Sequence, residues 1–169
     1  KNVSFYYCST QRYDADGKGG TWTGPVPGQS LISLDHPDFK DKVINNASAL
    51  HFEDCSFNAQ NDAAFYGIHL GRRNNLTVNA PFVVELKNCD MVPFAFGSHV
   101  GTAFNAGITI FADNTNVAFN QYGTNTCTIS DLLIVTKNGA TAGELPSVVS
   151  CDNVYKYTVA TANNIEKTE

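Results

Sequence analysis

Short stretches in which apolar and polar residues alternate recur along most of the chain. Near the C-terminus, Tyr155, Tyr157 and Val159 alternate with Lys156 and Thr158. A period of two is the pattern of a β-strand with one buried and one solvated face. Gly, Asn, Asp and Pro, which favour turns, separate these stretches. The pattern predicts strands at 2–8, 29–34, 48–57, 64–70, 75–78, 81–88, 93–96, 107–112, 116–121, 126–136, 147–151 and 153–160.

Helical patterning is nearly absent. No long segment has apolar residues spaced by three and four positions, and only 37–44, after a capping Asp35, is predicted to form a turn or two of helix. Short strands at intervals of roughly 8 to 12 residues, with frequent turns, are typical of sandwiches and barrels. We therefore expect an all-β fold, an antiparallel β-sandwich of the immunoglobulin-like or jelly-roll type.

An internal similarity keeps a second fold open. The segment Gly67-Ile68-His69-Leu70 precedes Cys89 by 22 residues, and Gly107-Ile108-Thr109-Ile110 precedes Cys127 by 20 residues. Repeats of roughly 20 to 25 residues are found in parallel β-helices, in which successive turns stack similar residues. A right-handed parallel β-helix is therefore the alternative to the sandwich.

The length of 169 residues, with 43% apolar and 16% charged side chains, suits one domain. Residues 9–28 hold five glycines, two prolines and the only tryptophan, a composition typical of a long loop. We expect an N-terminal arm with this Gly-rich loop over 1–47, a β-core over 48–160 and a polar tail over 161–169. The chain begins at Lys1 without a signal-like segment, which suggests a processed or excised piece.

The five cysteines show neither CxxC spacing nor Cys-His clustering, so a zinc site is not expected. Two pairings are natural, Cys55 with Cys89 and Cys127 with Cys151, and they leave Cys8 over. We expect both pairs to form disulfides, with buried reduced thiols as the alternative. Disulfides would place the protein outside the cell, at a cell or virion surface.

Three asparagines, Asn2, Asn46 and Asn75, fit the N-x-[ST] pattern of glycosylation acceptors. Because the chain contains 18 asparagines, two or three such sequons arise by chance, and they do not decide the source of the protein. We retain them as candidate glycosylation sites.

Charge and hydropathy exclude several partners. The net charge of −5 argues against nucleic acid and against anionic membranes, which both require a basic surface. No apolar run approaches the roughly 18 to 20 residues of a membrane span, so none is expected in this fragment.

Residues 81–90, Pro-Phe-Val-Val-Glu-Leu-Lys-Asn-Cys-Asp, resemble the third-strand motif of chaperone–usher fimbrial pilins and adhesins. Cys55, followed 15 residues later by Leu70-Gly71, and the turn at 139–144 before a last alternating stretch are similar to further parts of that family. The resemblance covers 48–160. It implies an incomplete immunoglobulin-like sandwich whose open groove is filled by a strand from a neighbouring subunit, a strand that the arm 1–47 would supply.

A second similarity, without a defining motif, is to receptor-binding domains of viral spike glycoproteins. These are also disulfide-linked β-sandwiches rich in Asn and Thr, and the sequons and the truncated start agree with the similarity.

Signatures of catalysis are missing. The chain has four histidines but no Gly-x-Ser-x-Gly elbow and no Gly-rich phosphate loop before a helix, so we do not expect an enzyme. Asp14 and Asp16, in Asp-Ala-Asp-Gly-Lys-Gly-Gly, form a weak candidate for a calcium site, with an ordinary turn as the alternative. No other cofactor is expected.

Two clusters suit ligand binding. The first is Tyr13 with Trp22 in the Gly-rich loop, where exposed aromatic side chains offer a large contact area. The second is Tyr66 and His69 with Arg72 and Arg73, the only adjacent cations in an acidic chain, which suit an acidic sugar or carboxylate. The alternatives are a tryptophan that holds the loop to the core and a solvated hairpin tip.

Together these patterns predict an extracellular adhesion or receptor-binding domain that recognises a cell-surface glycan or protein. Two alternatives remain. One is a pilus-type structural subunit completed by strand exchange with a neighbour. The other is a fragment of a β-helix enzyme that acts on polysaccharides, which requires acidic and basic residues along stacked parallel strands.

Overall fold

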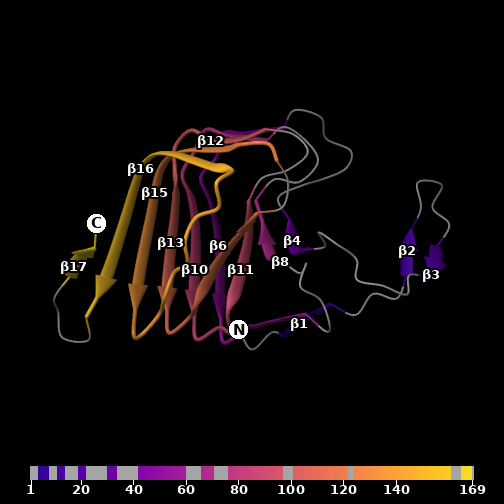
Figure 1. The fold of residues 1–169 in the computed structure, drawn as a ribbon, viewed down its shortest axis with the longest axis horizontal. Coiled ribbons are helices and arrows are strands. Elements are labelled where there is room, and N and C mark those ends of the chain that lie inside the picture. Colours follow the sequence, from indigo (N-terminus) through magenta and orange to yellow (C-terminus); the bar gives the residue numbers. More distant parts are fainter. Residues whose placement is uncertain are drawn as a thin grey trace.

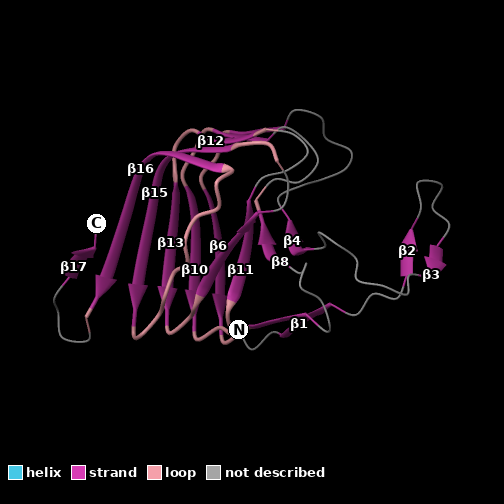
Figure 2. Ribbon diagram, in the orientation of Figure 1, coloured by secondary structure: helices cyan, strands magenta, loops and turns pink. Residues whose placement is uncertain are grey.

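The computed structural model describes residues 4–7, 11–13, 19–21, 30–33, 42–59, 66–70, 76–96, 101–121, 124–160 and 165–168. These residues form strands and connecting segments without a helix (Figure 2). The strands are β1 (Ser4–Tyr7), β2 (Gln11–Tyr13), β3 (Gly19–Thr21), β4 (Ser30–Ser33), β5 (Lys42–Ile44), β6 (Ser48–Glu53), β7 (Ser56–Ala59), β8 (Tyr66–His69), β9 (Leu76–Val78), β10 (Phe82–Lys87), β11 (Val92–Phe96), β12 (Thr102–Phe104), β13 (Ile108–Asp113), β14 (Val117–Gln121), β15 (Cys127–Lys137), β16 (Val149–Val159) and β17 (Ile165–Thr168).

The strands coil into a parallel β-helix of about three turns. Strands β16, β15, β13, β10 and β6 lie side by side in that order and run in the same direction (Figure 1). Residues that stack on one another in neighbouring turns are 34, 26, 25 and 22 positions apart in the sequence, from the first turn to the last. Parallel strands pair with a partner one turn away, because a tight hairpin cannot connect them.

Three walls surround the core. The long-strand wall contains β6, β10, β13 and the second halves of β15 and β16, and the short-strand wall contains β5, β9, β12 and the first halves of β15 and β16. The third wall contains β4, β8, β11 and β14. Outside these walls β1 pairs with β7 in parallel, whereas β2–β3 and β16–β17 are antiparallel pairs.

Alternating side chains fill the interior of the coil. In the long-strand wall the inward side chains of β10 stack on those of β13, so that Phe82, Val84 and Leu86 are all buried. The third wall contributes an aromatic group, in which Phe119 lies 5.9 Å from Phe94 and 5.8 Å from Phe96, measured between ring centroids. Full burial of such a side chain contributes about 1.5–3 kcal/mol, so these columns supply most of the driving force for folding.

One corner of the coil, where the long strands end, is built by Asp and Asn in the left-handed conformation. Asp54, Asn88, Asn114 and Asn138 have φ values of 53°, 50°, 47° and 54°. Asn and Asp tolerate this region better than other residues with a Cβ. The amide of Asn114 donates to Oδ1 of Asn88 at 3.1 Å, and the amide of Asn88 donates to Oδ1 of Asp54 at 3.2 Å. We call this row the Asn ladder.

A second row of amides stacks at the corner between the short and long strands. The amide of Asn79 donates to Asn45 at 3.0 Å, and that of Asn105 donates to Asn79 at 2.8 Å. Gly107, with φ +80°, follows in the same corner, where a Cβ would lie 2.6 Å from the carbonyl oxygen of Asp131. This close approach of the next turn requires glycine.

The all-β prediction is confirmed, but the antiparallel sandwich is wrong, and with it the sandwich that the pilin resemblance implied. A period of two shows that a strand has an inner and an outer face, and it says nothing about which strand is the partner. The parallel β-helix, kept as the alternative, is the fold. The similarity that suggested it is not the structural repeat, however, because Ile68 pairs with Phe94, whereas Ile108 pairs with Phe82 and Leu132.

Several predicted boundaries also change. The predicted strand 48–57 breaks at the Asp54 corner, and the predicted strands 147–151 and 153–160 are the single strand β16. The helical turn predicted at 37–44 is wrong at 42–44, which is β5, and the rest lies outside the described residues. Two strands within the range expected for the arm 1–47 pair with the coil, since β4 pairs with β8 and β5 with β9.

Both predicted disulfides are wrong, because Cys55, Cys89, Cys127 and Cys151 are free thiols. Cys55 and Cys89 follow the Asn ladder residues on successive turns, and each thiol donates to a backbone carbonyl, at 3.3 Å to Glu53 and at 3.4 Å to Lys87. Stacked turns thus bring equivalent cysteines into neighbouring positions without joining them. Cys8 lies outside the described residues.

Replacing Asn114 tests the Asn ladder. Asn114→Ala removes the hydrogen bond to Asn88 and forces a Cβ without a polar group into the left-handed region. We expect it to lower the free energy of unfolding by about 1–3 kcal/mol. Asn114→Gly removes the same bond but relieves the backbone strain, so its loss should be smaller. Urea unfolding measures both, and equal losses in the two variants would contradict the role of the positive φ.

The buried thiol of Cys127 predicts a specific dependence of stability on pH. Burial, with a smaller effect of Cys151, raises the pKa of Cys127 from 9.0 to about 12. Above pH 9 the unfolded chain loses this proton before the folded chain does, so the thiol's contribution to stability is complete below pH 9 and is lost as the pH rises towards 12. In urea unfolding between pH 8 and 11, stability should fall less steeply in Cys127→Ala than in the unchanged protein. Parallel pH profiles would show that this thiol does not titrate differently on folding.

Candidate functional site

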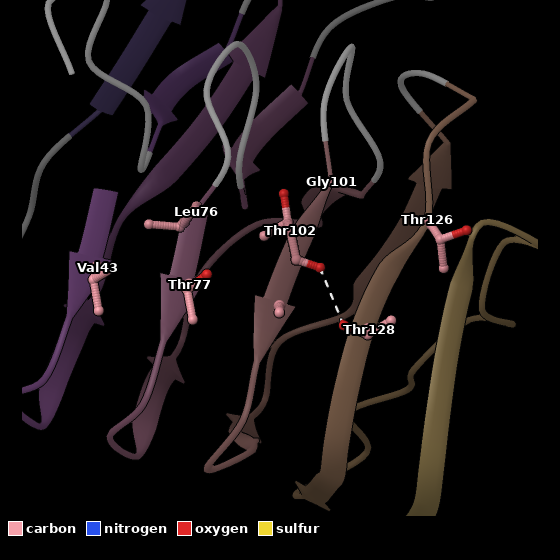
Figure 3. A pocket seen from close by; sticks show the side chains of 8 residues that line it. Val43, Leu76, Thr77, Gly101, Thr102, Thr126 and Thr128 are labelled. Atoms are coloured by element: carbon pink, nitrogen blue, oxygen red, sulfur yellow. Dashed lines mark hydrogen bonds between the residues drawn. The ribbon is translucent and has the colours of Figure 1, made fainter. Parts of the chain in front are cut away.

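The short-strand wall carries an open hollow with a volume of about 450 Å³ (Figure 3). This volume lies within the roughly 300–1,000 Å³ of sites for small organic molecules. The hollow is shallow and open along the wall. It is lined by Val43, Leu76, Thr77, Gly101, Thr102, Ala103, Thr126 and Thr128.

Its floor is a row of small side chains that point outward from consecutive strands. In register order the row contains Val43 of β5, Thr77 of β9, Ala103 of β12 and Thr128 of β15. The row arises because the first and third residues of each short strand lie on one face and the middle residue on the other, as in Leu76-Thr77-Val78, where Leu76 and Val78 are buried. We call it the threonine shelf. Neighbouring strands are about 4.8 Å apart, so Thr77 and Thr128, two strands apart, lie about 10 Å from each other along the helix axis.

Thr102 lies at the edge of this hollow, but its hydroxyl is buried on the inner side of the wall. It pairs in register with Leu76 and Cys127, occupies an inward position and is 4% exposed. Its Oγ1 has no hydrogen-bond partner among the described residues, whereas its backbone carbonyl accepts a bond from Thr128 Oγ1 at 3.4 Å, drawn in Figure 3. A buried hydroxyl without a partner costs about 1–3 kcal/mol. Because this hydroxyl is on the inner side of the wall, a ligand on the outer shelf does not reach it.

The described lining of the hollow contains no charged side chain. Its described lining is made of threonine, glycine and aliphatic side chains, so it has neither a group that titrates near neutral pH nor a cation or carboxylate to select a charged ligand. Such a surface suits an uncharged molecule that carries hydroxyl groups and has apolar C–H faces.

The charged residues gather on the outer face of the long-strand wall instead. At one register position Glu53, Lys87, Asp113 and Lys137 follow each other on successive strands, with Lys87–Glu53 at 3.1 Å and Lys137–Asp113 at 3.6 Å. His51 lies beside them, 2.9 Å from Glu85 and 3.8 Å from Glu53. The three carboxylates therefore each have a cation or histidine within 4 Å, and exposed pairs of this kind contribute about 0–1 kcal/mol each.

The same face becomes apolar towards the C-terminal strands. Phe111 is 40% exposed and Tyr155 is 38% exposed, and Leu133 and Val135 lie between them. Singly exposed apolar residues are ordinary, but a contiguous group of this kind is a recognised feature of contact surfaces. It lies on a different wall from the hollow.

The predicted binding clusters are only partly described. Tyr13 ends β2 and Tyr66 begins β8, and the structure describes neither side chain. Trp22, Arg72 and Arg73 lie outside the described residues. His69, on β8, is fully buried, so it is not on the surface where the prediction required it. The described residues therefore do not bring either cluster together.

The other predicted sites have a similar outcome. Asp14 and Asp16, the calcium candidates, lie outside the described residues, and the described part contains no group of three or more His, Cys, Asp or Glu side chains that could hold a metal. Asn46 is exposed at a corner of the coil, so that sequon remains a candidate for glycosylation. Asn2 and Asn75 are not described.

Sequence reasoning missed the hollow because it did not stack these strands on one another. The segment Leu76-Thr77-Val78 lies within the predicted strand 75–78, but Thr102-Ala103-Phe104 is too short to show a period of two and was not predicted. The sequence does contain a signal for these two strands, because each of them is directly followed by Asn-Ala, at Asn79-Ala80 and Asn105-Ala106. That repeat marks the amide corner and so locates the strands before it.

Within the described residues no helix is long and apolar enough to cross a membrane. Comparisons with models of protein families, with curated proteins and with solved structures found no match to this chain.

Proposed function

We propose that this protein binds an uncharged polysaccharide, which lies along the axis of the β-helix on the threonine shelf. The observation that carries the proposal is the threonine shelf itself, whose outward residues Thr77 and Thr128 line an open hollow with no charged side chain among its described lining residues. This function retains the expected recognition of a glycan and moves it from the loops to a wall of the coil.

The register of the wall favours an extended ligand. Parallel strands repeat at a constant interval, so hydroxyl groups on alternate strands recur along the axis at a fixed spacing. A linear polysaccharide also presents its hydroxyl groups at regular intervals, and several weak contacts along one chain add to useful affinity. Val43, which is 52% exposed at one end of the shelf, offers an apolar contact for the C–H face of a sugar ring.

The chemistry of the hollow supports binding rather than cleavage. General acid–base catalysis needs a titratable side chain within hydrogen-bond distance of the reacting group. The nearest arrangement of this kind among the described residues, His51 with Glu85 and Glu53, is on the long-strand wall. The acidic and basic residues that a polysaccharide-cleaving enzyme requires are therefore present along stacked strands, but away from the hollow.

The location of the protein is a separate matter. The expected extracellular location was inferred mainly from disulfides, and the thiols are free. The proposed glycan binding does not depend on the compartment, and an adhesion role at a surface remains a prediction.

Thr102→Val separates a binding role from a structural role. Valine keeps the branched shape and removes the unpaired hydroxyl, so we expect the free energy of unfolding to rise by about 1 kcal/mol. Because this hydroxyl faces the core and not the shelf, affinity for the ligand should be unchanged in the same variant. Affinity electrophoresis in gels that contain neutral polysaccharides such as xylan, glucomannan or β-glucan, with urea unfolding in parallel, measures both effects.

Thr128→Val should weaken binding about threefold to tenfold, because it removes a hydroxyl of the shelf itself. The matched control is Thr109→Val, an outward threonine of β13 on the long-strand wall, which should leave binding unchanged. Failure of every neutral polysaccharide to retard the protein, or equal retardation of all four proteins, would refute the proposed site.

A further inference from the structure

The middle of the hollow on the short-strand wall carries no outward side chain larger than a methyl group. Gly101, just before β12, and Ala103 within it both line the hollow, and Thr102 between them is buried. The neighbouring strands carry larger outward side chains, Thr77 on β9 and Thr128 on β15, and both pair in register with Ala103. The line along β12 is therefore a bare floor with a threonine on the strand at either side (Figure 3).

Gly101 is a glycine that the fold does not require. Its φ lies outside the left-handed region, and a Cβ built on it would meet no atom of the described residues within 4 Å. Its carbonyl accepts a hydrogen bond from the Leu76 N–H at 3.4 Å, so its backbone already pairs like that of a strand residue. Gly107 differs, because its φ of +80° and the carbonyl of Asp131 exclude a side chain there. Glycine in a strand weakens it and often marks a place where a ligand approaches the backbone closely.

The space over β12 has the dimensions of one sugar ring. The backbones that carry Thr77 and Thr128 are two strands, or about 10 Å, apart. A pyranose ring with a hydrogen bond of about 2.8 Å on either side spans a distance of this order. A ring with equatorial substituents has a flat C–H face, which can contact the Ala103 methyl group and the bare backbone of Gly101 at van der Waals distance.

The spacing of the strands also selects how the rings are linked. In a β-1,4-linked chain of glucose or xylose each ring advances the chain by a distance close to the strand spacing of about 4.8 Å. Three consecutive rings of such a chain, lying along the axis of the β-helix, therefore stay over β9, β12 and β15. An α-1,4-linked chain coils, so it does not keep three consecutive rings on one wall.

We propose that residues 101–103 form a central subsite for the middle one of three rings of an extended β-1,4-linked glycan, and that Gly101 is its specificity-determining residue. This inference rests on the proposed binding of an uncharged polysaccharide and adds the linkage class and the position of one ring. The hydroxyl groups of Thr77 and Thr128 bind at the two sides of that ring. The missing side chain at position 101 determines how closely the ring approaches the wall.

Isothermal titration of the full chain with cellohexaose and with maltohexaose tests the linkage. The two oligosaccharides contain the same glucose units, joined by β-1,4 bonds in the first and by α-1,4 bonds in the second. We expect cellohexaose to bind at least about tenfold more tightly, because it alone can place a ring over each of the three strands.

Gly101→Val tests the position of the ring. Valine suits a strand and meets open space here, so the fold should be retained, whereas its two methyl groups fill the central subsite. We expect the affinity for cellohexaose to fall at least about tenfold. Ala49→Val is the matched control, since it adds the same bulk at an exposed outward position of β6 on the long-strand wall and should leave binding unchanged. Urea unfolding of each variant shows whether the fold is retained.

Gly101→Ala keeps the test decisive if Gly101→Val fails to fold, because it adds only a Cβ, and it should weaken binding about threefold. Equal affinity for the two oligosaccharides, or unchanged affinity for cellohexaose in a folded Gly101 variant, would overturn the central subsite. Neutral polysaccharides that still retard the protein in gels would then leave the proposed function in place. Absence of binding to both oligosaccharides and to every neutral polysaccharide would remove the subsite and the proposed function together.

Discussion

In-register hydrogen bonding between successive turns is the interaction on which the whole structure depends. Once β10 is aligned with β6 and β13, every side chain is stacked on its equivalents one turn away. The apolar columns of the core, the Asn ladder and the row of charged residues all follow from that single alignment. A slip of one residue would turn each strand over and place its inner side chains in water, so the buried columns fix the register in return.

The same alignment organises the surfaces. Threonines that are far apart in the sequence share the shelf because the short strands are stacked, and Lys87 neutralises Glu53 because their strands are neighbours. The two walls differ in chemistry although they are continuous through β15 and β16. Charge is concentrated on the long-strand wall, whereas the hollow of the short-strand wall is neutral. The two walls of one coil thus differ in the charge of their described side chains.

The sequence predicted the local structure well and the long-range pairing poorly. Alternation located β10, β13 and β14 to within a residue or two, because a period of two is a property of the strand itself. The sandwich was wrong because alternation carries no information about partners. The pattern that indicates stacked turns lies in the corner residues, because Asp54, Asn88, Asn114 and Asn138 each end a long strand. This pattern is informative only when the four residues are recognised as left-handed. The hollow was not predicted, because it forms only when the short strands are stacked, and β12 is too short for its alternation to be recognised.

The unequal lengths of the turns have a consequence for how this protein can vary. The spacing shortens from 34 to 22 residues along the chain, yet the path from the amide corner through the long strand to the Asn ladder keeps nearly the same length on each turn. Almost all of the difference falls in the arc between the Asn ladder and the short-strand wall. That arc includes the paired strands β8, β11 and β14, so insertions and deletions that leave the alignment of the coil unchanged are those in the segments between these strands and the short strands, which are the natural place for grafting new segments beside a fixed scaffold.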